Sequence, residues 1–246
     1  MRPPPDPSLL YPDVMASGSL AAVLREAAAG CLATLPDDAL TPAGPLHAAV
    51  SAAVPHRAPL TVGAWAHVRR WSVRGTEPYQ GMCLVDGWTH DLAEVARAAR
   101  AWRDGVPLEE VRRAAPFVHL TGRFEVPDND PVRLAASEWQ HLRREAYELE
   151  YDWREPYQAL IEAAHASPAL RALYPFTSHW VLRFSTATRP RLALVGPCLT
   201  ANSDGTYAVG TSMVASDLGL FATAGEAVAC AVRHLPAGLG PVTPGE

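Results

Sequence analysis

Lysine is absent from this chain of 246 residues, in which arginine supplies all 21 basic side chains. Lysine is ordinarily among the commonest residues of soluble domains. Its absence excludes catalysis through a lysine Schiff base, including pyridoxal phosphate chemistry. It also excludes a Walker-type phosphate-binding loop, because that loop needs a lysine amine.

Other signatures are missing as well. The sequence has no Gly-x-Ser-x-Gly, His-Glu-x-x-His or Gly-x-Gly-x-x-Gly motif and no EF-hand loop. The common hydrolase, zincin, dinucleotide-binding and calcium-binding classes therefore lose their main support. The few cysteines are widely spaced, which favours reduced, buried thiols over disulfides or a metal site; they are Cys31, Cys83, Cys198 and Cys230. We predict neither a cofactor nor a metal.

Charge and hydropathy narrow the range of partners. A net charge of −5 and a pI near 6.0 argue against nucleic acid, whose binders usually carry a basic face. No apolar run approaches the roughly 18 residues that a membrane helix needs. We expect a cytoplasmic protein that binds a small molecule or a peptide, and the sequence does not indicate its oligomeric state.

The composition, 48% hydrophobic and 19% charged, is that of a globular protein. We expect a proline-rich flexible arm over residues 1–15 and a sheet-plus-helix unit over residues 16–125. A helical connector and a second sheet-plus-helix unit follow over residues 126–246. The two units form either one compact domain or two.

In the first unit, residues 60–66, 70–74 and 81–86 have strand patterns. Asp91, followed three residues later by Glu94, predicts the capped start of a helix. Trp65 and Trp71 fall on one predicted strand face, where they either stack a planar or peptide ligand or fill the core.

The second unit repeats this order. Strand patterns cover residues 178–186, 191–198 and 206–213, and Thr223 with Glu226 predicts another capped helix. Asp130 and Pro131 predict the first helix of the connector. The fold class is therefore α+β with mainly antiparallel sheets. The shared order reflects either an internal duplication or coincidence.

Candidate catalytic residues are densest from Trp153 to Ser185. Tyr157 and His165 share one face of a predicted helix. Strand alternation would place Trp180, Leu182 and Phe184 on an apolar face and the following residues on the other: His179, Val181, Arg183 and Ser185.

A histidine exchanges protons near neutral pH, and an arginine holds a carboxylate or phosphate with two hydrogen bonds. We therefore take His165 and His179 as candidate acid–base groups. Arg183, Tyr157 and Trp180 are the candidate substrate-binding groups. The alternative is that His179 and Arg183 lie on a solvated strand face and that His165 binds a carbonyl at a helix end.

Asp86 and His90 form a second candidate catalytic pair, because they lie between a predicted strand and a predicted helix, where loops often carry function. The alternative is structural. Asp86 and Gly87 would then form a turn, and Thr89 or Asp91 would cap the helix.

The segments 157–165, 173–180 and 221–236, with 84–87 and 91–96, resemble an actinobacterial domain family of unknown function. Members of that family are labelled natural product biosynthesis proteins, and the resemblance extends over about residues 55–240. It implies a place in biosynthetic gene clusters and names no reaction, cofactor or site residue.

Two functions are compatible with these observations. The first is a tailoring or accessory enzyme of natural product biosynthesis that applies acid–base chemistry to a small, acidic or peptide-derived substrate. The second is a non-catalytic binding module for a carrier, a peptide or a partner protein, or an immunity-type protein. Whether the protein is an enzyme stays open at the level of the sequence.

Overall fold

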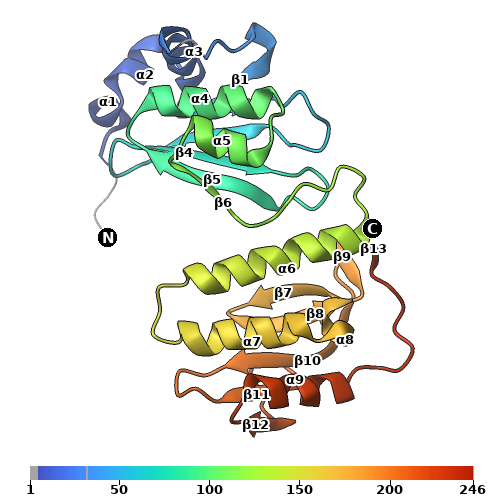
Figure 1. Ribbon diagram of the computed structural model, residues 1–246. Coiled ribbons are helices and arrows are strands. Elements are labelled where there is room, and N and C mark those ends of the chain that lie inside the picture. The colour runs from blue at the N-terminus through green and yellow to red at the C-terminus, as the bar shows by residue number, and fades with distance from the viewer. Residues whose placement is uncertain (1–4, 32, 246) are drawn as a thin grey trace. The chain divides into compact units, whose positions relative to one another are not determined.

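The computed structural model describes residues 5–31 and 33–245. The chain divides into two compact units, Met1–Thr121 (unit 1) and Gly122–Glu246 (unit 2). Each unit combines helices with an antiparallel sheet, so the α+β class is confirmed (Figure 1). Among the described residues, no helix is long and apolar enough to cross a membrane.

Unit 1 holds a six-stranded antiparallel meander in the order β1-β2-β3-β4-β5-β6. The strands are β1 (Leu40–Gly44), β2 (His47–Val50), β3 (Leu60–Ala64), β4 (Trp71–Thr76), β5 (Cys83–Thr89) and β6 (Val118–Leu120). Buried and exposed residues alternate along β2, β3 and β4. This alternation gives the sheet one apolar face and one polar face.

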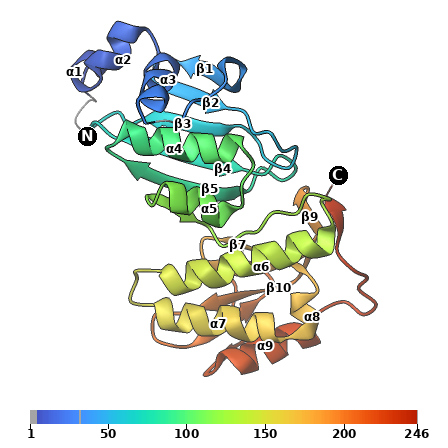
Figure 2. The same ribbon diagram turned by 45° about the horizontal axis from the view of Figure 1, so that its top comes forward.

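The helices of unit 1 are α1 (Pro7–Leu10), α2 (Pro12–Ser17), α3 (Leu20–Gly30), α4 (Leu92–Arg103) and α5 (Leu108–Ala114), with a short 3-10 turn, η1 (Asp37–Ala39). Of these helices, α3, α4 and α5 pack on the apolar face of the sheet. Figures 1 and 2 show α4 and α5 over one face of the sheet. Asp91 caps α4 as predicted, accepting the Ala93 N–H at 2.8 Å, whereas Glu94 accepts the Thr89 hydroxyl.

The expectation of a flexible arm over residues 1–15 does not hold from Pro7 onward; residues 1–4 lie outside the described residues. Pro7 and Pro12 occupy the first positions of α1 and α2. Proline suits these positions, because the first N–H of a helix has no partner within the helix. Tyr11 and Val14 are fully buried, so this segment belongs to the core of unit 1.

The strand predicted to begin at Arg70 starts at Trp71, and residues 65–70 form a loop. Trp71 is fully buried, whereas the Trp65 side chain is 43% exposed. The single face predicted for these two rings is therefore wrong, because the chain turns between them.

Unit 2 contains a five-stranded sheet in the order β12-β11-β10-β8-β7, packed against helices. The helices are α6 (Pro131–Glu148), α7 (Arg154–Ala166), α8 (Pro168–Arg171) and α9 (Ala224–Arg233). The strands are β7 (Tyr174–Ser178), β8 (Val181–Ser185), β9 (Ala187–Pro190), β10 (Leu194–Ala201), β11 (Tyr207–Gly210), β12 (Gly219–Phe221) and β13 (Thr243–Gly245). The last strand pairs in parallel with β9.

Two helix starts in unit 2 follow the sequence signals. Asp130 caps α6 by accepting the Arg133 N–H at 2.8 Å, and Thr223 with Glu226 forms both halves of the capping box of α9. The two sheets differ in their number of strands, and internal duplication stays a prediction.

The strand predicted over residues 178–186 is confirmed only from Val181 to Ser185, as β8. Ser178 ends β7, and His179 and Trp180 form the turn between the two strands, with φ angles of 51° and 66°. Two residues with positive φ produce the tight turn that matches strand twist. The polar strand face predicted for His179, Val181, Arg183 and Ser185 does not form, because Val181 and Ser185 are buried.

A substitution at Gly75 would test the packing between β4 and α4 in unit 1. A Cβ on this residue of β4 would lie 2.5 Å from the Trp102 ring and 2.8 Å from Val85 Cγ2. We expect Gly75→Ala to lower the free energy of unfolding by about 1 to 3 kcal/mol through overpacking, measured by urea denaturation. Gly30→Ala is the matched control, because a Cβ there meets nothing within 4 Å. Equal effects of the two substitutions would contradict the packing described.

Candidate functional site

The candidate residues of unit 2 do not converge on one site. His165 lies near the end of α7 with its ring 5.5 Å from that of Trp139, and it lines a cavity that neither His179 nor Arg183 lines. His179 is exposed on the β7–β8 turn. The Arg183 guanidinium stacks on the Phe176 ring at 5.4 Å.

Tyr157 and Trp180 belong to an aromatic cluster in unit 2. The Tyr157 ring lies edge-on to Trp180 at 5.6 Å and to Trp153 at 5.6 Å. Tyr157 is fully buried, and this burial raises the pKa of its phenol, aided by the negative charge of Glu145. The Tyr157 hydroxyl therefore has no access to solvent. The substrate-binding role of Trp180 stays a prediction.

Asp86 and His90 have partners other than each other. His119 Nδ1, on the neighbouring strand β6, lies 3.3 Å from Asp86 Oδ1. His90 Nδ1 lies 2.7 Å from the Arg69 carbonyl oxygen, and its ring is edge-on to Trp88. Asp86 therefore has a histidine partner, but the partner comes from a strand that is distant in sequence.

Asp86 and His119 lie on the polar face of the unit 1 sheet, which we call the open face because none of the described helices of unit 1 covers it. Strand register assembles its side chains in two rows. One row consists of Thr61, Arg74, Asp86 and His119, and the other of His47, Gly63, Ser72 and Trp88. Residues that are paired across strands lie next to each other, so each row crosses the sheet without a break.

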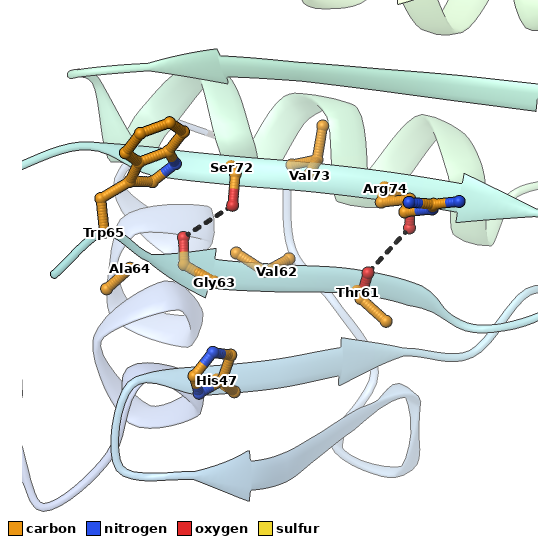
Figure 3. A pocket seen from close by; sticks show the side chains of 9 residues that line it. All are labelled: His47, Thr61, Val62, Gly63, Ala64, Trp65, Ser72, Val73 and Arg74. Atoms are coloured by element: carbon orange, nitrogen blue, oxygen red, sulfur yellow. Dashed lines mark hydrogen bonds between the residues drawn. The ribbon is translucent and has the colours of Figure 1, made fainter. Parts of the chain in front are cut away.

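The open face is hollowed over β2, β3 and β4 by a cavity of about 360 Å³ (Figure 3). Gly63 forms its floor: a Cβ there would lie 3.3 Å from the His47 ring and 3.4 Å from Ser72 Oγ. The Ser72 hydroxyl donates to the Gly63 carbonyl at 3.3 Å. Arg74 lies at one end of the cavity and Trp65 at the other, as Figure 3 shows.

A stacked trio adjoins this cavity. The guanidinium carbon of Arg70 lies 3.2 Å from the centroid of the Trp65 ring and 4.5 Å from that of the Trp88 ring. Cation–π attraction holds such an arrangement. Trp65 and Trp88 are 43% and 52% exposed, so two large aromatic surfaces face solvent with a cation fixed beside them.

The hydroxyl of Tyr11 fixes the loop that carries Trp65 and Arg70. It lies 2.8 Å from the Trp65 carbonyl oxygen, to which it donates, and it accepts the Arg70 N–H at 3.0 Å. Arg69 strengthens this link through two hydrogen bonds of 2.8 Å to the Asp13 carboxylate. The Arg69 hydrogen bonds hold the pKa of Asp13 below its usual value.

The open face is rich in potential cations. Arg74, Arg70, His47 and His119 lie on or beside it, whereas Asp86 is the one carboxylate among the described outward-facing residues of the unit 1 strands. The face therefore suits anionic groups. No group of three or more His, Cys, Asp or Glu that could hold a metal occurs among the described residues.

Sequence reasoning found Asp86 and considered Trp65 as a stacking residue. It assigned Arg70 and Arg74 to no site, and it missed His119. The sequence of β4 could have indicated Arg74, because apolar and polar residues alternate there. This alternation puts Ser72 and Arg74 on the face opposite Trp71 and Val73. The pairing of β5 with β6 had no comparable signal, because α4 and α5 separate these strands in the sequence.

Removal of the Tyr11 hydroxyl tests how the trio is held. We expect Tyr11→Phe to destabilise unit 1 by about 1 kcal/mol, because partly buried backbone groups lose their partner. Amide hydrogen exchange at residues 65–70 should accelerate. Tyr79→Phe, in the loop after β4, is the control. Unchanged exchange at these amides in Tyr11→Phe would contradict the role given to the hydroxyl.

The comparisons with known proteins concern unit 2. Residues 133–246 match the sequence profile of a family of unknown function, DUF6193. The match includes the segments 157–165, 173–180 and 221–236, and it excludes 84–87 and 91–96. No curated protein and no solved structure matches the chain. The matched part of the chain is thus similar to a family whose description names no activity, and the open face of unit 1 lies outside the match.

Proposed function

We propose that the protein is a binding module whose unit 1 holds an acidic segment of a peptide or partner protein on the open face. One observation carries the proposal: the Arg70 guanidinium is stacked between two half-exposed tryptophans, beside a cavity that ends at Arg74. Large exposed aromatic surfaces mark interaction sites. Tryptophan and arginine are also the residues that most often dominate binding energy at interfaces.

The chemistry of the ligand follows from the groups on the face. The exposed guanidinium of Arg74 can hold a carboxylate through two parallel hydrogen bonds. The Trp65 and Trp88 rings offer flat surfaces for an aromatic or aliphatic side chain. A segment in which acidic residues alternate with an aromatic residue would satisfy both.

Such a module fits the second function considered from the sequence, a binder of a carrier, a peptide or a partner protein. The resemblance to natural product biosynthesis proteins implies the setting in which such a ligand would occur. The proposal itself rests on the chemistry of the open face.

Fluorescence anisotropy with two labelled ten-residue peptides tests the proposal. One peptide carries glutamates around a central tyrosine, and the other has lysine in place of each glutamate. We expect the acidic peptide to bind in a saturable and salt-sensitive manner, because exposed charges are screened by salt. The lysine peptide should not bind.

Variants locate the contact. Arg74→Ala and Trp88→Ala should each weaken binding of the acidic peptide at least about tenfold, which corresponds to roughly 1.4 kcal/mol. Arg113→Ala is the control: it removes the same charge from α5, on the helix-covered side of the sheet, where Arg113 is exposed. Equal binding of both peptides, or equal losses in Arg74→Ala and Arg113→Ala, would refute the proposal.

The second candidate is the acid–base enzyme. The observation that favours it is the hydrogen-bond distance between Asp86 and His119, next to Arg74 in the same cross-strand row. A carboxylate can orient an imidazole for proton transfer, and Arg74 would bind an acidic substrate beside it.

Mass spectrometry of the acidic peptide after prolonged incubation separates the two candidates. An enzyme that cleaves the peptide would change its mass, and His119→Ala would abolish the change without lowering the melting temperature. A peptide that binds and is recovered unchanged would favour the binding module.

A further inference from the structure

Unit 2 contains a cavity of about 450 Å³ that the proposed function does not use. It opens where α6, α7 and α8 meet. Its polar wall consists of Gln140 and Arg143 from α6, His165 from α7 and Arg171 from α8, and Trp139 contributes apolar surface. Cavities of roughly 300 to 1,000 Å³ are typical of small-molecule sites.

Positively charged groups outnumber negatively charged ones around this cavity. Arg143 donates from Nε to Glu162 at 2.7 Å, which leaves the two terminal nitrogens of its guanidinium outside that bond. The Arg171 side chain is exposed and makes no hydrogen bond or ion pair within the described part of the chain. Two guanidinium groups and an imidazole therefore face one carboxylate, so the cavity carries an excess of positive charge.

His165 responds to this environment. Partial burial lowers the pKa of its imidazole, and the positive charges of Arg143 and Arg171 lower it further, whereas Glu162 acts in the opposite direction. The neutral imidazole is thus favoured while the cavity holds no anion. An anion placed among these groups would reverse the balance and favour the imidazolium.

We infer that this cavity is a binding site for a small organic anion, held by Arg143, Arg171 and His165 through its phosphate or carboxylate group. The two guanidiniums supply hydrogen bonds in pairs to the oxyanion, and the Gln140 amide adds a donor. The volume of the cavity leaves space for an organic body beyond the anionic group. The inference concerns unit 2 alone and does not depend on the proposed function of unit 1.

Anion binding at this site should be coupled to protonation of His165. Because a protonated His165 adds a third positive charge, binding should tighten as the pH falls through the pKa of His165. By reciprocity, a bound anion should raise the pKa of His165. Non-specific screening by salt would not saturate and would act alike on other exposed histidines.

NMR titration of the histidine side chains in the full-length protein tests the inference. Sulfate represents the phosphate group, because its charge is constant from pH 5 to 8, and acetate represents the carboxylate. Sodium chloride keeps the ionic strength constant. We expect saturable shifts at His165 with at least one probe and a rise of its pKa by about half a unit or more. The probe that binds identifies the anionic group.

Two arginine variants provide the control. Arg171→Gln should weaken binding of that probe about tenfold or more. Arg154→Gln, which removes an exposed charge from the opposite end of α7, should leave binding unchanged. The inference is overturned if neither probe gives a saturable shift at His165, or if the two variants weaken binding equally.

Discussion

The candidate surface of unit 1 depends on the hydrogen bonds of one side-chain hydroxyl, that of Tyr11. It connects the start of the chain to the loop between β3 and β4 by donating to the Trp65 carbonyl and accepting the Arg70 N–H. Its ring also packs 4.9 Å from that of Trp71 in the core. A loop of six residues without such a link would lose the fixed stacking of Arg70. The two helices before α3 thus serve to shape a surface that is more than fifty residues away in the sequence.

A difference in how the two sheets are covered explains why their sites differ. In unit 1, the apolar rows of β2 to β5 pack on α3 and α4, and the polar rows face outward. In unit 2, Tyr174 and Phe176 pack with Ala135 and Val242, so part of the second face of the sheet is also buried. A surface for an extended ligand is therefore available in unit 1, whereas the cavity of unit 2 lies among helices.

The sequence predicted most of what local chemistry controls. Asp91, Asp130 and Thr223 cap helices where the pattern indicated, because a cap depends only on a few neighbouring residues. The errors arose where tertiary contacts override local preference. His179 and Trp180 adopt positive φ although neither is glycine, because the pairing of Ser178 with Val181 leaves them as a two-residue turn. The partnership of Asp86 with His119 and the stacking of Arg70 between Trp65 and Trp88 need the assembled sheet, so neither could be found from spacing.

The absence of lysine links the two proposed sites. Every permanent cation in the chain is a guanidinium, which stays charged at all physiological pH values and binds oxyanions through paired donors. Histidine is then the cationic side chain whose ordinary pKa lies near neutrality. Histidines are therefore the cationic side chains from which we expect a change of anion binding between pH 5 and 8. On the open face of unit 1, Arg70 and Arg74 would stay charged between pH 5 and 8, and Trp65 and Trp88 have no titratable group. In unit 2, His165 lines the same cavity as Arg143 and Arg171, so anion binding at the inferred site would be coupled to proton uptake by His165.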